Sequence, residues 1–172
     1  EIGPRYSMSE KNNRRLEGLV GKRYILFTDI TRYYPSIYTH SISWASHTKE
    51  VAKLRSSMKD SSLLGNRLDI LVRNMQDGQT MGLPIGPITS LIIEEIVGTA
   101  IDVEFEKALG EDVSGYRYTD DMEFYFNTYE EADKALNSLN KIVRKYELDL
   151  NSNKTKIVKI PHPLEKDWFY FF

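Results

Sequence analysis

The sequence predicts an α+β fold in which helices alternate with four short strands. Runs of β-branched and aromatic residues are separated by segments whose apolar residues recur at helical spacing. With a helical insertion at about residues 41–80 set aside, the order is strand, helix, strand, strand, helix, strand. This is the order of the ferredoxin-like split βαβ unit, in which the first strand lies beside the hairpin. The 172 residues suffice for one domain with a buried core.

The composition excludes several classes of protein. Because the chain has no cysteine, it can form neither disulfide bonds nor a zinc site with cysteine ligands. No apolar run approaches the roughly 18–20 residues of a membrane span, and no secretory signal opens the chain, so we expect no membrane partner. The formal net charge of −2 lacks the basic surplus common in nucleic-acid-binding domains.

The first predicted strand runs from Arg23 to Ile30, a nearly continuous apolar stretch that suits a buried strand. Pro35 interrupts the tyrosine-rich segment that follows. A helix is expected within Ser41 to Leu54, and residues 55–60 are expected to form a polar loop.

A second helix is expected after an N-cap at Ser61 or Ser62, and it should end at Asp77-Gly78. Its apolar residues recur at helical spacing: Leu64, Leu68, Leu71, Val72 and Met75.

A rigid Gly- and Pro-rich loop over residues 82–87 precedes a long helix, for which Thr89 or Ser90 is the expected N-cap. The predicted apolar face of this helix is Ile92, Ile93, Ile96, Val97, Ala100 and Ile101.

A hairpin is predicted from strands at about 116–118 and 122–126, joined by a turn. Thr128 and Glu131 have the spacing of a capping box, which should open a helix. The last strand is expected at 155–160. The buried face of the helix should be Ala132, Leu136, Leu139, Val143 and Tyr146.

The predicted turn of the hairpin contains two adjacent carboxylates, Asp120 and Asp121. A third, Asp29, ends the first strand, which the predicted fold brings beside the hairpin. Clustered carboxylates repel one another and need a compensating cation, for which Mg²⁺ is the usual choice. The alternative is a solvated acidic turn.

Four segments follow one another along the chain: FTDITRYYPSIY from Phe27, GLPIGPITS from Gly82, YTDD from Tyr118 and LDLNSNKTKIV from Leu148. They resemble motifs A, B, C and D of reverse transcriptases, and most resemble those of bacterial abortive-infection and defence-associated enzymes. The resemblance covers about residues 23–168. It implies a polymerase palm with a helical fingers insertion, and an RNA-directed or template-independent DNA polymerase in the bacterial cytoplasm.

The resemblance implies a two-metal site for nucleotidyl transfer. Asp29 and Asp120 would bridge two Mg²⁺ ions, for which Mn²⁺ is a substitute, and Ile30 would offer its backbone carbonyl. Asp121 would be the supporting catalytic carboxylate.

The resemblance also implies four nucleotide-binding residues. Tyr34 stands at the position of a steric gate, where an aromatic ring fills the space of a ribose 2′-hydroxyl. Arg32 would meet the triphosphate, and Gly86 would let the backbone approach the nucleotide. Lys154 would neutralise or protonate the leaving pyrophosphate. Each residue also has a purely structural interpretation. Tyr34 would be an aromatic residue of the core, Arg32 an exposed arginine, Gly86 part of a plain turn, and Lys154 a surface lysine.

Ile85 replaces a glutamine found in retroviral and intron-encoded relatives, which favours the defence type and leaves template dependence open. The expected partners are deoxynucleoside triphosphates and a template with a nucleic-acid or protein primer; self-association stays open. Rival hypotheses are a group II intron or retron-type enzyme, and a catalytically silent palm used for assembly or RNA binding.

Three regions are expected along the chain: a polar segment at 1–22, the palm with partial fingers at 23–160, and an aromatic segment at 161–172. The last would lead toward a thumb. Because further fingers and thumb regions are expected outside this chain, we expect it to be nearly inactive alone.

Overall fold

The computed structural model describes residues 8–54, 60–110 and 113–161. The expected polar loop falls almost entirely on residues 55–59, outside the described residues. The same is true of the aromatic segment from residue 162 onward.

The four strands form one antiparallel sheet in the order β2-β3-β1-β4. The strands are β1 (Tyr24–Asp29), β2 (Ser114–Tyr118), β3 (Asp121–Phe126) and β4 (Lys156–Lys159). This is the order of the ferredoxin-like unit, so the predicted fold class is confirmed. In consequence β1 lies directly beside β3, although 91 residues separate Asp29 from Asp120 in the sequence.

Side chains alternate between the two faces of the sheet. On β3, Met122, Phe124 and Phe126 join the hydrophobic core. Asp121 and Glu123 therefore point to the opposite side, which we call the open face. The chemistry expected of this chain thus lies on the face away from the core.

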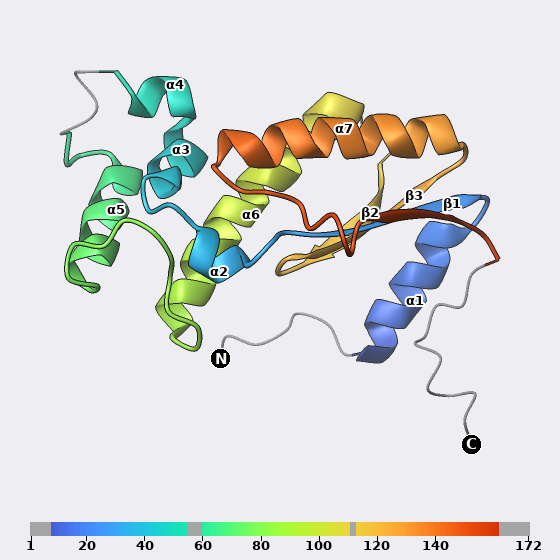
Figure 1. Ribbon diagram of the computed structural model, residues 1–172, viewed down its shortest axis with the longest axis horizontal. Helices are drawn as coiled ribbons and strands as arrows, with labels where there is room; N and C mark the ends of the chain where they lie inside the picture. The colour runs from blue at the N-terminus through green and yellow to red at the C-terminus, as the bar shows by residue number, and fades with distance from the viewer. Residues whose placement is uncertain (1–7, 55–59, 111–112, 162–172) are drawn as a thin grey trace.

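Two long helices, α6 (Ile88–Leu109) and α7 (Tyr129–Lys145), lie on the core side of the sheet. Figure 1 shows α7 running along the sheet on one side and α1 (Met8–Leu19) on the other. The capping box predicted at Thr128 and Glu131 is present, with the reciprocal contacts of both side chains. Ala132, Leu139, Val143 and Tyr146 of the predicted face of α7 are buried, and Leu136 is half-buried.

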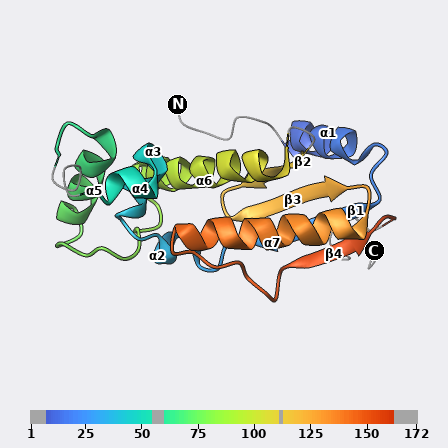
Figure 2. The same ribbon diagram turned by 90° about the horizontal axis from the view of Figure 1, so that it is seen from above.

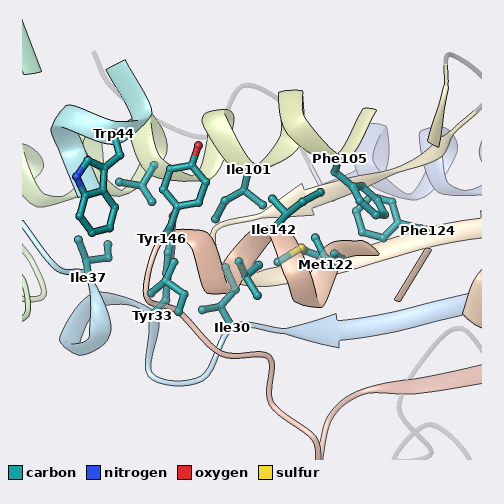
Figure 3. Packing of buried hydrophobic residues seen from close by; sticks show 14 of the residues in the cluster. Ile30, Tyr33, Ile37, Trp44, Ile101, Phe105, Met122, Phe124, Ile142 and Tyr146 are labelled. Atoms are coloured by element: carbon teal, nitrogen blue, oxygen red, sulfur yellow. The ribbon is translucent and has the colours of Figure 1, made fainter. Parts of the chain in front are cut away.

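The hydrophobic core fills the space between the sheet, α6 and α7, and extends toward α3 (Ser41–His47). Figure 3 shows this continuity, from the tilted ring pair of Phe105 and Phe124 at one end to Trp44 at the other. Ile30 and Tyr33 join the core directly after β1, and so anchor the end of the strand that carries Asp29.

A separate group of helices lies beyond the end of the sheet (Figure 2): α3, α4 (Lys49–Ala52) and α5 (Leu64–Asn74). The single helix expected within Ser41 to Leu54 is broken, because Thr48 has a φ of 71°, which no helix accommodates. The expected serine N-cap of α5 is wrong: Leu63 holds that position, and Ser62 instead donates its N–H to Asp60. Three residues of the predicted apolar face of α5 are exposed: Leu64, Leu71 and Met75.

The expected N-cap of α6 is also wrong, because the helix begins at Ile88, two or three residues earlier than a Thr89 or Ser90 cap requires. Pro87 is the N-cap, with extended backbone and no side-chain bond. Ile93, Val97 and Ile101 are buried as predicted, whereas Ile92 is exposed. No helix among the described residues is long and apolar enough to cross a membrane.

Candidate active site

Three aspartates meet at one end of the open face. Asp29 ends β1 and stands opposite Asp121 in the antiparallel register of β1 and β3. The N–H of Ile30 donates to the backbone carbonyl of Asp120 at 3.2 Å. The structure therefore brings the end of β1 and the hairpin turn together, as the strand order predicts.

The three carboxylates differ in exposure. Asp29 is only 3% exposed, Asp120 is half-buried and Asp121 is exposed. Burial raises the pKa of Asp120, and the negative charges of Asp29 and Asp121 raise it further. Asp120 thus stands in a negative potential that disfavours its own ionisation.

Asp29 is held by residues that precede β4. Lys154 Nζ lies 2.6 Å from Asp29 Oδ2, and Asn151 Nδ2 donates to Asp29 Oδ1 at 3.2 Å. The hydrogen bond to Asp29 is the main reason that the pKa of Lys154 is raised. Lys154 is therefore a protonated cation, and it neutralises the most buried of the three carboxylates.

The donor atoms suit a divalent metal, because carboxylate and carbonyl oxygens are the ligands that Mg²⁺ prefers. The side chains nevertheless do not form a ready-made cage: among the described residues, no group of three or more acidic or histidine side chains is arranged to hold a metal ion. Both oxygens of Asp29 are instead engaged within the protein, one by Lys154 and the other by Asn151.

Tyr34 lies in α2 (Tyr33–Ser36), the short helix that follows β1. Its carbonyl accepts the N–H of Leu83 at 2.8 Å, which joins α2 to the loop before α6. Gly82 of this loop has a φ of 86°, and a Cβ there would lie 3.2 Å from the carbonyl oxygen of Pro35. Glycine thus permits the close approach that docks the loop on α2.

The remaining predicted nucleotide-binding residues flank this junction. Arg32 is exposed and has a left-handed backbone, with a φ of 47°, at the N-cap of α2. Gly86 has a φ of 115°, a conformation that L side chains rarely adopt. Ile85 and Ile88 beside it are 76% and 60% exposed, so neither belongs to the core.

Sequence reasoning missed Glu94, a buried carboxyl on α6 that is 2% exposed. Burial foremost, and then the charge of Glu95, raise the pKa of Glu94 to about 7. Its Oε2 is without a hydrogen-bond partner, and a side-chain hydrogen bond links its carboxyl to Tyr34. The available signal was its place on the buried stripe of α6, between Ser90 and Val97.

Arg117 on β2 was also missed. Its side chain is 5% exposed and pairs with Glu95 and Asp102, both on α6. The available signal was a pair of carboxylates seven residues apart on one predicted helix, together with an arginine in the strand before the Asp-Asp turn.

Comparison with known proteins agrees with this geometry. The model of a family described as reverse transcriptase (RNA-dependent DNA polymerase) matches residues 4–166. Among solved structures, the chain is similar to apo telomerase from Candida tropicalis truncated from its C-terminal domain, with a TM-score of 0.63 and 16% identity. The match covers 92% of this chain but only 36% of that chain, so the two share a fold over about a third of the telomerase chain. No curated protein sequence matches.

Proposed function

The chain belongs to the reverse transcriptase (RNA-dependent DNA polymerase) family, and we propose on this premise that it catalyses nucleotidyl transfer from deoxynucleoside triphosphates. In this reaction a 3′-hydroxyl oxygen, or a protein hydroxyl oxygen, bonds to the α-phosphorus. The bond from that phosphorus to the bridging oxygen of pyrophosphate breaks, and the hydroxyl proton passes to solvent.

The observation that carries the proposal is the meeting of Asp29, Asp120 and Asp121 at one end of the open face. Burial foremost, and then the charges of Asp29 and Asp121, raise the pKa of Asp120, and a bound cation would relieve the repulsion between these carboxylates. Asp29 and Asp120 are the proposed ligands of two Mg²⁺ ions, with the carbonyl of Ile30 as a further ligand, Asp121 in support, and Mn²⁺ as a substitute. Bound ions of this kind lower the pKa of the attacking hydroxyl and neutralise the triphosphate.

Lys154 is the proposed proton donor to the leaving group. Its ammonium is charged and stands 2.6 Å from Asp29 Oδ2, at the edge of the site. Transfer of one proton from Nζ to the departing oxygen would stabilise pyrophosphate as the phosphorus–oxygen bond breaks.

Tyr34 is the proposed selector of the sugar. Its phenol is half-buried and meets the ring of Tyr33 edge to face at 6.2 Å, which restricts where the ring can go. A fixed ring beside the sugar would exclude a 2′-hydroxyl by its volume. Arg32 and Gly86 are the proposed contacts to the triphosphate and to the nucleotide.

Within the family, we assign the chain to the bacterial antiphage-defence type. Ile85 is the supporting residue, because an apolar side chain cannot replace the amide contacts of a glutamine at this position. The same change leaves two modes of synthesis, templated and template-independent, for experiment to separate.

The test is incorporation of labelled dNTP or NTP by the chain, with and without an RNA template, in Mg²⁺ or Mn²⁺. Asp120→Ala is the active-site variant, and Asp133→Ala on the exposed side of α7 is the matched control. Because further fingers and thumb regions are expected outside this chain, we expect only weak dNTP incorporation, which Asp120→Ala abolishes and Asp133→Ala leaves unchanged. Label that persists in Asp120→Ala would refute the assigned site, and a preference for NTP would refute the role of Tyr34.

A second candidate function is a catalytically silent palm that serves assembly or RNA binding. The supporting observation is the engagement of Asp29 by Lys154, together with the lack of a ready-made metal cage among the described residues. Titration with Mn²⁺ separates the two functions. Two sites that are lost in Asp29→Ala support the enzyme, whereas no binding to the wild type supports the scaffold.

A further inference from the structure

Arg117 is a buried cation on the core side of the sheet, and it forms ion pairs with two carboxylates of α6. Nε lies 2.9 Å from Asp102 Oδ2. The two terminal nitrogens donate to the two oxygens of Glu95, at 3.0 and 3.1 Å. This bidentate geometry depends on the planar fork of a guanidinium, which lysine lacks.

One further N–H of Arg117 points at the hairpin turn. Nη1 donates to the backbone carbonyl of Thr119 at 3.0 Å. Thr119 has a φ of 59°, a conformation that is unfavourable for a β-branched residue. Because the carbonyl of Thr119 and the Cα of Asp120 belong to one planar peptide unit, holding that carbonyl restrains Asp120.

Gly98 on α6 provides the space for the guanidinium. A Cβ at position 98 would lie 2.5 Å from Cζ of Arg117, and 2.6 and 2.7 Å from its two terminal nitrogens. Since these atoms end a flexible side chain, a methyl group would displace the guanidinium and leave the backbone in place. Alanine is also the better helix former, so the helix itself would not suffer.

We propose that Arg117 is a positioning residue that holds the Asp120-Asp121 turn in place from α6, through Glu95, Asp102 and the space left by Gly98. Arg117 lies on the core side and does not itself meet the substrate. The catalytic consequence of this role rests on the proposed function, whereas the placement of the turn does not.

Two variants test the role by different routes. Arg117→Lys keeps the positive charge but removes the planar guanidinium. Gly98→Ala keeps Arg117 but adds a methyl group in the space that its guanidinium occupies. Arg144→Lys is the matched control, because Arg144 is 69% exposed and its ion pair with Asp149 is 3.5 Å long.

Hydrogen exchange at the Ile30 amide reports where the turn lies, since this N–H donates to the carbonyl of Asp120. We expect exchange at Ile30 to rise about tenfold or more in Arg117→Lys and Gly98→Ala, with exchange at Leu26 and Phe124 unchanged. Arg144→Lys should behave as the wild type. Unchanged exchange at Ile30 would overturn the proposal. So would an equal rise throughout the sheet, because a salt bridge that only stabilises the fold would loosen every strand.

Primer extension then tests the catalytic consequence. Misplacement of the turn is expected to lower kcat about 100-fold, while KM for the nucleotide changes less than about threefold. An unchanged kcat despite faster exchange at Ile30 would overturn the catalytic part of the role. If the wild type shows no incorporation that Asp120→Ala abolishes, the proposed function fails, and the exchange measurement still decides the role of Arg117.

Discussion

The carboxyl of Glu94 should make the stability of the chain depend on pH, because its pKa is raised from 4.5 to about 7. Below pH 4.5 the group is neutral in the folded and the unfolded chain. As the pH rises to about 7, the unfolded chain releases this proton first, so the free energy of unfolding falls. Above pH 7 the penalty is complete.

Glu94→Gln should remove this penalty while it keeps the shape of the side chain. We expect the variant to be more stable than the wild type by roughly 1–2 kcal/mol at about pH 8, and to match it at about pH 4. Urea unfolding in EDTA measures both differences. A stability gain of equal size at both pH values would contradict the prediction.

Lys154 should compete with a metal ion for Asp29, since its ammonium occupies Asp29 Oδ2. In Lys154→Gln we expect a lower melting temperature in EDTA, because the buried carboxylate loses its counter-charge. Added Mn²⁺ should raise the melting temperature more than in the wild type, because the metal no longer displaces a cation. Lys159→Gln, an exposed lysine of β4, is the control. A smaller Mn²⁺ shift in Lys154→Gln would contradict the competition.

At the scale of residues, the proximity of Asp29 to Asp120 and Asp121 could be predicted, because it follows from strand order alone. Glu94 and Arg117 could not be found in this way. Their importance depends on which face of α6 meets which face of β2, and this is decided by packing between elements far apart in the sequence.

At the scale of elements, the capping box of α7 should contribute measurably to stability. Thr128 accepts the N–H of Glu131, and the side chain of Glu131 accepts in return from the N-cap backbone. Thr128→Ala is expected to destabilise the chain by about 1 kcal/mol. This corresponds to a fall of about 2–4 °C in melting temperature for a chain of this size.

Thr99→Ala is the control for Thr128→Ala, because Thr99 is exposed in the middle of α6 and caps nothing. It should leave the melting temperature unchanged or slightly higher, since alanine favours a helix. Equal effects of the two substitutions would show that the capping box does not stabilise α7.

Helix existence was easier to predict than helix ends. Apolar spacing located α6 and α7, because it reflects burial against the sheet. The ends of α5 and α6 were misplaced, because Leu63 and Pro87 hold the N-cap positions through extended backbone without a capping side chain. The break at Thr48 carries no proline or glycine to mark it.

At the scale of the whole molecule, α1 closes part of the open face through one buried ion pair. Arg15 Nε lies 2.7 Å from Glu123 Oε1, and the two side chains are 15% and 6% exposed. Arg15 ends a basic run of the sequence that begins at Lys11, yet its side chain is largely buried. A contact between residues 108 positions apart cannot be inferred from local pattern.

Breaking this pair should destabilise the chain strongly. Arg15→Met leaves Glu123 buried without its counter-charge, and we expect a loss of about 3–5 kcal/mol. The double variant Arg15→Met, Glu123→Gln should recover a large part of that loss, because no buried charge remains. Chemical unfolding of the three chains measures both steps. Failure of the double variant to recover stability would mean that α1 is held by other contacts.

The alternation of β3 also governs which changes of chain length the molecule can survive. A one-residue insertion in the hairpin turn that shifts the pairing of β3 by one residue would turn Met122, Phe124 and Phe126 out of the core and turn Asp121 into it. An insertion that misplaces the carboxylate by one step therefore also abolishes folding. Selection for a folded chain thus protects the site even when activity is not under selection. Natural differences in length are accordingly expected in the loop between α5 and α6, and not in the hairpin.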